Sequence, residues 1–170
     1  MYLQDYDEVL PRYYSTPPYY YMVDEVTAPY IKNQQIWVCP SRFTFLHDCG
    51  SHPPETQHGL RTQFPISYAY NNFTESYGEV NGISGSQYLG ASGRPLAKIK
   101  FPAETIVTGD GQCERFWGAP FVNNFNAPSS SYPKHNEGSN FGFIDGHAKW
   151  VKGGALRHYM FDTTRLVATY

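Results

Sequence analysis

The segment of residues 135–151, HNEGSNFGFIDGHAKWV, is the part of this chain that most constrains its fold. Two runs of alternating character, residues 140–144 and 147–151, flank the dipeptide Asp145-Gly146. Asp-Gly in this setting is the strongest short-range signal of a β-hairpin, because a two-residue type I′ turn needs positive φ at both central positions. The segment therefore predicts a C-terminal hairpin in which Gly146 adopts a positive φ.

The rest of the chain combines short elements with long irregular segments. Residues 1–10 predict a helix that ends before Pro11 and resembles the C-terminal piece of something longer. The other predicted elements are a short helix at 22–31 interrupted at Ala28-Pro29, an extended run at 36–39, strands at 67–70 and 104–108, and loops at 40–63, 71–93 and 112–133. The predicted fold class is α+β, with the N-terminal helix packed on a small antiparallel sheet that contains the hairpin.

Length, net charge and aromatic content limit the classes of function that this chain can have. A chain of 170 residues is long enough for one domain with a real core, and its net charge of -2 gives no electrostatic footprint for nucleic acid. Aromatic residues make up 17% of the chain and charged residues 16%. Low charge with many tyrosines and turns suits a loop-rich extracellular protein. The aromatics either fill a core beneath the loops or form a surface that stacks on glycans.

Three cysteines are present, which is an odd number for a chain stabilised by disulfides. Cys39 and Cys49 are separated by a loop-like stretch, so a local disulfide between them is expected in an oxidising compartment, with Cys113 free. Cys113 is an alternative partner for either one. Zinc binding by Cys39 and Cys49 with His47 and His52 is less favoured, because the compact C-x-x-C half-site of structural zinc fingers is missing.

Several phrases of the chain, taken in order, resemble bacterial prepilin-like proteins related to the type II secretion pseudopilins. They are YLQDYDEVLP at 2–11, APYIKNQQIWVCPS at 28–41, SYAYN at 67–71, PAETIVTGDG at 102–111, and the tail in which His135 precedes Asp145-Gly146-His147. The resemblance implies an exported, non-catalytic subunit of a pilus- or pseudopilus-like assembly, at the cell surface or outside the cell. Its partners would be copies of itself or related pseudopilin subunits.

The resemblance also divides the chain. Members of the group carry a basic leader and an apolar N-terminal helix that anchors the subunit and packs the filament centre. Residues 1–10 would be the C-terminal stub of that helix and residues 11–170 a single globular head. We therefore expect membrane attachment only through the missing helix, which the given chain lacks either because it was cut to the soluble head or because the gene never encoded it. We also expect the chain to form no filaments unaided.

Acidic and imidazole side chains are expected to meet at one edge of the sheet. Asp110 follows a strand, and His135, Asp145 and His147 surround the hairpin. Asp110, His135 and Asp145 are the candidate metal ligands, and with backbone carbonyls they would suit calcium, whereas His135 with His147 would favour a transition metal. The simpler alternative is that Asp145-Gly146 is turn chemistry and that His135 ties a loop by hydrogen bonds.

No catalytic motif is present, since the chain lacks a Gly-x-Ser-x-Gly elbow, a His-Glu-x-x-His pair and a phosphate-binding glycine loop. Asn72 begins an N-glycosylation sequon, Asn-Phe-Thr. The sequence thus favours a structural assembly subunit. The alternative is a secreted module that binds glycans or a partner protein, and it would expose several rings in a coplanar row instead of burying them.

Overall fold

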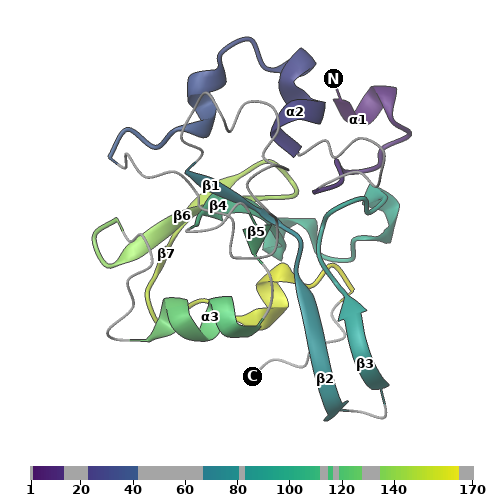
Figure 1. Ribbon diagram of the computed structural model, residues 1–170, viewed down its shortest axis with the longest axis vertical. Helices are drawn as coiled ribbons and strands as arrows, with labels where there is room; N and C mark the ends of the chain where they lie inside the picture. The colour runs from purple at the N-terminus through teal and green to yellow at the C-terminus, as the bar shows by residue number, and fades with distance from the viewer. Residues whose placement is uncertain are drawn as a thin grey trace, which may run out of the picture.

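A five-stranded sheet with the order β5-β1-β4-β6-β7 forms the centre of the molecule (Figure 1). This is a computed structural model, and it describes residues 2–13, 23–41, 67–80, 83–111, 115–116, 119–127 and 135–164. The strands are β1 (Tyr68–Asn71), β4 (Ile106–Asp110), β5 (Arg115–Phe116), β6 (Gly138–Phe143) and β7 (Ala148–Lys152). The pairs β1-β4, β4-β6 and β6-β7 are antiparallel, and the short β5 lies parallel to β1 at one edge. Together with the short helices, this sheet confirms an α+β architecture.

The C-terminal hairpin is confirmed, but its turn differs from the predicted two-residue type I′. The Phe143 N–H donates to the His147 carbonyl at 2.8 Å, and the Gly146 N–H donates to the Phe143 carbonyl at 2.9 Å, so the loop comprises residues 144–146. Gly146 has a φ of 96°, whereas Asp145 does not have a positive φ. This pattern is typical of a type I turn followed by a left-handed residue, which needs positive φ only once. The prediction for Gly146 is confirmed and that for Asp145 is wrong.

The N-terminal helix α1 (Tyr2–Asp5) is shorter than predicted. Asp7 and Glu8 have φ values of 52° and 56°, and left-handed residues cannot continue a right-handed helix to residue 10. Leu3 of α1 packs against a small apolar cluster, which ties the helix to the side of the sheet. The cluster consists of Leu10, Ala91 and Ile99, with Leu3, Leu96, Val107 of β4 and Ile144 packed against it.

A second group of short helices follows α1. The interrupted helix predicted at 22–31 is confirmed as α2 (Val23–Thr27) followed by the 3-10 helix η1 (Ala28–Tyr30). The extended run predicted at 36–39 is confirmed only in part, because the 3-10 helix η2 (Gln34–Trp37) occupies residues 36 and 37, whereas Val38 is extended with φ -110° and ψ 119°. The Asn33 side chain accepts a hydrogen bond from the Gln35 N–H at 3.0 Å, which caps η2 at its start.

Two segments predicted as loops contain regular structure. Residues 71–93 include a second antiparallel sheet made of β2 (Thr74–Val80) and β3 (Ile83–Tyr88), which extends away from the central sheet in Figure 1. Residues 112–133 include β5 and the helix α3 (Ala119–Asn126). The strand β4 begins at Ile106 instead of residue 104, because Pro102–Glu104 forms the 3-10 helix η6. The remaining 3-10 helices are η5 (Leu96–Lys98) and η7 (His158–Phe161).

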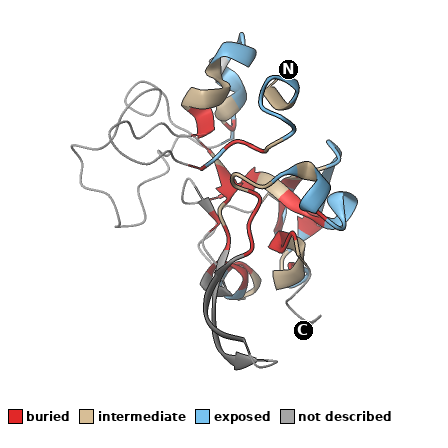
Figure 2. Ribbon diagram, turned by 90° about the vertical axis from the view of Figure 1, so that its right-hand side faces the viewer, coloured by how far each residue is buried: buried red, intermediate tan, exposed pale blue. Residues whose placement is uncertain are grey.

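The core lies where the sheet meets α3 and η7, and it is built mainly from phenylalanine rings. Figure 2 shows the buried residues gathered in the middle of the molecule. The aromatic members of the core are Phe143, which is 4% exposed, and six rings that are at most 2% exposed: Phe73, Phe116, Phe121, Phe125, Phe141 and Phe161. Their ring centroids lie 4.6–6.4 Å apart in the contacting pairs, a range in which aromatic contacts are favourable. Much of the aromatic excess of the chain therefore serves the core.

Candidate metal centre

Asp110 is the last residue of β4 and is held in the interior of the sheet. Its side chain is 3% exposed, and its backbone pairs with Tyr68 of β1. One carboxylate oxygen, Oδ2, accepts a hydrogen bond from the Asn140 N–H of β6 at 2.6 Å. That bond fixes the carboxylate in place and leaves Oδ1 to face His135.

His135 occupies the first position of a tight turn that leads into β6. Asn136 and Glu137 have φ values of 54° and 64°, and His135 and Gly138 form an isolated antiparallel bridge on either side of them. Positive φ at both central positions is typical of a type I′ turn. The indole Nε1 of Trp150 on β7 donates to the His135 carbonyl at 2.8 Å. The turn and this bond anchor the histidine to the hairpin.

Cys39 follows η2 and is brought to the sheet by the start of β1. The Ser67 N–H donates to the Trp37 carbonyl at 2.8 Å, which joins the two segments. Cys39 is 5% exposed and carries a free thiol. The pKa of Tyr68 is raised, first by burial, then by the charges of Cys39 and Asp110 and by the hydrogen bond that its hydroxyl makes to Cys39. Tyr68 thus borders both acidic side chains.

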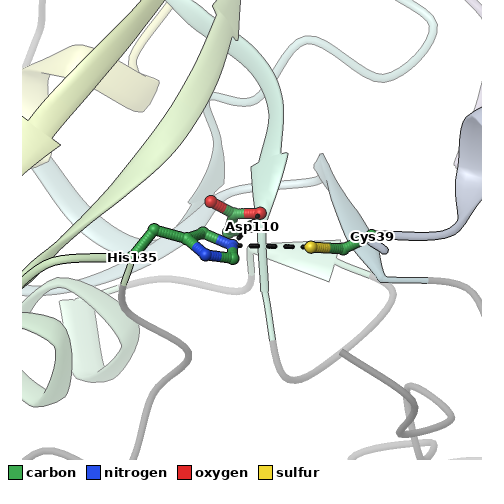
Figure 3. A group of neighbouring side chains, drawn as sticks. All are labelled: Cys39, Asp110 and His135. Atoms are coloured by element: carbon green, nitrogen blue, oxygen red, sulfur yellow. Dashed lines mark hydrogen bonds and ion pairs between the residues drawn. The ribbon is translucent and has the colours of Figure 1, made fainter. Parts of the chain in front are cut away.

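The side chains of Cys39, Asp110 and His135 converge on one point (Figure 3). The His135 Nε2 lies 3.5 Å from the Cys39 Sγ and 3.5 Å from the Asp110 Oδ1. One ligand atom from each residue lies within 4.8 Å of the other two. In the described part of the chain, no other set of three or more histidine, cysteine or acidic residues meets this criterion.

This arrangement differs from a nucleophile–histidine–acid relay. In a relay the nucleophile contacts one ring nitrogen and the acid orients the histidine through the other. Here the thiol and the carboxylate both approach the same nitrogen, Nε2. Three unlike donors that point at one position can hold a cation between them, whereas they offer no path for a proton across the ring.

The structure brings together two of the three predicted metal ligands, Asp110 and His135, and not Asp145. Asp145 sits at the tip of the hairpin, where its Oδ1 lies 2.6 Å from the His147 Nδ1. Asp110 bonds to Asn140, and β6 runs about 10 Å farther, at roughly 3.3 Å per residue, before the turn that carries Asp145. The strand length thus separates Asp145 from the other two.

Asp145 acts in the turn, as the simpler alternative expected. Its carboxylate accepts from the His147 backbone N–H at 3.1 Å, and this bond, followed by the side-chain bond to His147, lowers the pKa of Asp145. The His147 ring stacks on Phe143 with centroids 4.3 Å apart. Among the predicted signature residues, Asp145, Gly146 and His147 therefore build the turn, and His135 belongs to the converging group.

Two further predictions concern residues near the site. Cys39 has a free thiol in this structure. Cys49, like His47 and His52, lies outside the described residues, so the Cys39–Cys49 disulfide stays a prediction for the mature protein. Asn72 follows β1 and is half-buried, with its N–H bonded to the Tyr70 carbonyl at 2.9 Å. Its glycosylation also stays a prediction.

The sequence suggested Cys39 as a zinc ligand only in a set with Cys49, His47 and His52, and it did not group Cys39 with Asp110 and His135. The place of Cys39 beside Asp110 and His135 depends on β1 pairing with β4, which joins segments distant in sequence.

In the part of the chain that the structure describes, no helix is long and apolar enough to cross a membrane. Protein-family models, curated proteins and solved structures gave no match to this chain.

Proposed function

We propose that this chain is the head of an exported pseudopilin-like subunit, which acts by assembling with copies of itself or with related subunits and has no catalytic role. The ordered series of phrases from residue 2 to residue 151 supports the proposal. The observation that carries it is an aromatic surface at the N-terminal helices, in which the half-buried Tyr2 contacts the exposed rings of Tyr6 and Tyr30. A pilin-type stem would join the head at this end of the chain.

The N-terminal aromatic surface is held in one arrangement before any partner arrives. Tyr2 and Tyr6 stack with centroids 4.3 Å apart, and Tyr30 meets Tyr2 edge-on at 5.6 Å. The Tyr30 hydroxyl donates to the Asp5 Oδ2 at 2.7 Å, and this bond is the main cause that raises the pKa of Tyr30 to about 12. Because α1 and η1 are fastened together in this way, a partner that covers the rings has little side-chain entropy to remove.

Exposure of these rings is unusual in a chain that buries most of its described phenylalanines. Tyr6 is 51% exposed and Tyr30 is 38% exposed, and Ile36 on the neighbouring η2 is 63% exposed. Aromatic residues are enriched at protein–protein contacts, where they supply large apolar area at low entropic cost. This end of the head therefore offers a contact surface for a second subunit.

The alternative of a glycan-binding module has less support. Glycan stacking favours rings that share a plane, whereas the planes of Tyr2 and Tyr30 are 78° apart. Trp150, which is 43% exposed, is held by its bond to the His135 carbonyl. Tyr2 and Tyr30 thus do not lie in one plane, as a row of stacking rings would require.

Site-specific photo-crosslinking tests the assembly proposal. A photoreactive phenylalanine analogue at position 6, introduced into the gene product in its own host cells, should give covalent dimers and higher oligomers. The matched control is position 124 on α3, since Asn124 is also exposed but faces away from the core on a different element. Equal crosslinking at both positions, or none at position 6, would contradict the proposal.

The coding sequence that precedes Tyr2 gives an independent test. A pseudopilin-like subunit should have an apolar helix there with a prepilin leader ahead of it. An upstream region that encodes neither would remove the proposed role, whatever the crosslinking result.

A further inference from the structure

We propose that Cys39, Asp110 and His135 bind one divalent transition-metal ion of the zinc type. The proposal stands on the geometry of the described residues and does not depend on the assembly role. It names Cys39 as a ligand, which places the metal between η2, β4 and the turn before β6.

The spacing of the donor atoms fits a tetrahedral ion. Zinc bonds of about 2.0–2.3 Å at tetrahedral angles place ligand atoms about 3.3–3.6 Å from one another. The Sγ–Nε2 and Oδ1–Nε2 distances in the group are both 3.5 Å. An ion can therefore enter with small side-chain movements, and the three side chains fill three of its four positions.

Two of the three donor residues are also held by hydrogen bonds outside the group. Asp110 receives the Asn140 N–H on Oδ2, and the carbonyl of His135 receives the Trp150 indole. The segment that carries Cys39 is joined to the residue before β1 by the bond from the Ser67 N–H to the Trp37 carbonyl. Supporting contacts of this kind orient metal ligands, and their loss typically weakens binding by about 10–100-fold. The ligand residues are thus positioned by hydrogen bonds that do not involve the ion.

The donor set selects among metals. Calcium takes oxygen ligands, so a thiolate and an imidazole do not suit it. Sulfur, nitrogen and oxygen together suit zinc and its neighbours, such as cobalt. The residues that converge therefore favour a transition metal over the calcium expected for Asp110, His135 and Asp145.

Metal binding and a disulfide at Cys39 exclude each other, because the metal needs the thiolate. The inference therefore expects Cys39 to be free in the mature protein. An ion held there would tie together residues 39, 110 and 135, which are far apart in the sequence. Such an ion would act as a cross-link between the N-terminal helices and the sheet.

Metal titration of the reduced, purified chain tests the inference. Zinc should bind at one equivalent per chain, and cobalt(II) should give the sulfur-to-cobalt charge-transfer absorption that reports a thiolate ligand. Cys39→Ser should abolish that absorption, and Asp110→Asn and His135→Gln should each weaken zinc binding by more than about 100-fold, beyond the effect of an outer contact. Zinc should raise the melting temperature of the unsubstituted chain by at least about 5 °C, by binding the folded state.

Two control variants make the titration specific. Asp145→Asn removes the predicted ligand that the structure places at the hairpin tip, and Cys49→Ser removes the cysteine nearest to Cys39 in sequence. Both should bind zinc as the unsubstituted chain does. Circular dichroism of every variant without metal separates loss of a ligand from loss of the fold, and a variant that fails to fold is replaced by its milder counterpart, Cys39→Ala or His135→Asn.

Three results would overturn the inference. The first is no saturable binding by the folded chain. The second is binding that Cys39→Ser leaves intact or that Asp145→Asn abolishes. The third is a Cys39–Cys49 disulfide as the main species in peptide mapping of the mature protein under non-reducing conditions.

Discussion

Replacement of Asn71 by alanine should destabilise the fold more than any change on its surface. The Asn71 side chain is fully buried and bonds to three backbone groups: its Nδ2 donates to the carbonyls of Ile106 at 2.6 Å and Phe161 at 3.0 Å, and its Oδ1 accepts from the Phe73 N–H at 3.1 Å. The amide thus joins β1, β4 and η7 in the interior.

The expected magnitude follows from the groups that the substitution leaves behind. A buried polar group without a partner costs about 1–3 kcal/mol, so the loss of three such bonds should lower the free energy of unfolding by at least about 3 kcal/mol. That corresponds to a fall in melting temperature of roughly 6–12 °C for a chain of this size. Asn71→Ser, which keeps one polar atom, should recover only part of this loss.

Urea unfolding followed by circular dichroism, with the free energy taken by linear extrapolation, measures the effect. The control is Asn124→Ala on the exposed face of α3, which should change the free energy of unfolding by less than about 0.5 kcal/mol. A loss below about 1 kcal/mol for Asn71→Ala would refute the reasoning, because it would mean that water or a shifted backbone satisfies the three groups.

The remaining predictions concern the sheet and its hairpin. Gly109→Ala should cost about 3 kcal/mol in urea unfolding, because the added Cβ would clash with the Phe141 ring and lie 2.8 Å from the Asn140 carbonyl oxygen. Gly146→Ala should lower the free energy of unfolding by only about 1 kcal/mol, because the added Cβ would meet nothing within 4 Å and only the φ of 96° opposes it. A larger loss of stability for Gly146→Ala than for Gly109→Ala would contradict both predictions. The pKa of Asp145 is lowered by the His147 N–H, so the stability that Asp145 contributes is present above its ordinary pKa of 3.8 and is lost as the pH falls through the lowered value. Acid unfolding should therefore be less steep in Asp145→Asn than in the unsubstituted chain, and identical profiles would argue against the turn bond.

The elements that local sequence determines were predicted well. The hairpin β6-β7 follows from the alternation of apolar and polar residues around Asp145-Gly146. Its turn differs from the prediction because a type I turn followed by a left-handed Gly146 reverses the chain direction equally well. The strands β1 and β4 were predicted to within two residues at each end. In each case the signal lies within a few adjacent residues.

The elements that were predicted as loops, β2, β3 and α3, have weaker secondary-structure signals in their sequences. The strands β2 and β3 flank the dipeptide Asn81-Gly82, a strong hairpin signal that their polar, glycine-containing sequence obscured. The helix α3 contains several asparagines, which have modest helix propensity. It forms because Phe121 and Phe125, four residues apart, both enter the core.

The candidate site shows where sequence reasoning ends. Asp110 and His135 were expected together because a strand end and a hairpin start meet at one sheet edge. Cys39 was assigned to a local disulfide, since nothing in its immediate sequence relates it to β4. Only the pairing of Tyr68 with Asp110, together with the bond between Ser67 and Trp37, brings the thiol to the carboxylate.

X-ray absorption at the zinc edge of the metal-loaded chain tests the central claim most directly, because it reports which atoms surround the ion. The account predicts one sulfur at about 2.3 Å with nitrogen and oxygen neighbours at about 2.0–2.2 Å. That sulfur should vanish in Cys39→Ser and persist in Cys49→Ser. A shell of nitrogen and oxygen alone, or a shell with two sulfurs, would contradict a centre built from Cys39, Asp110 and His135.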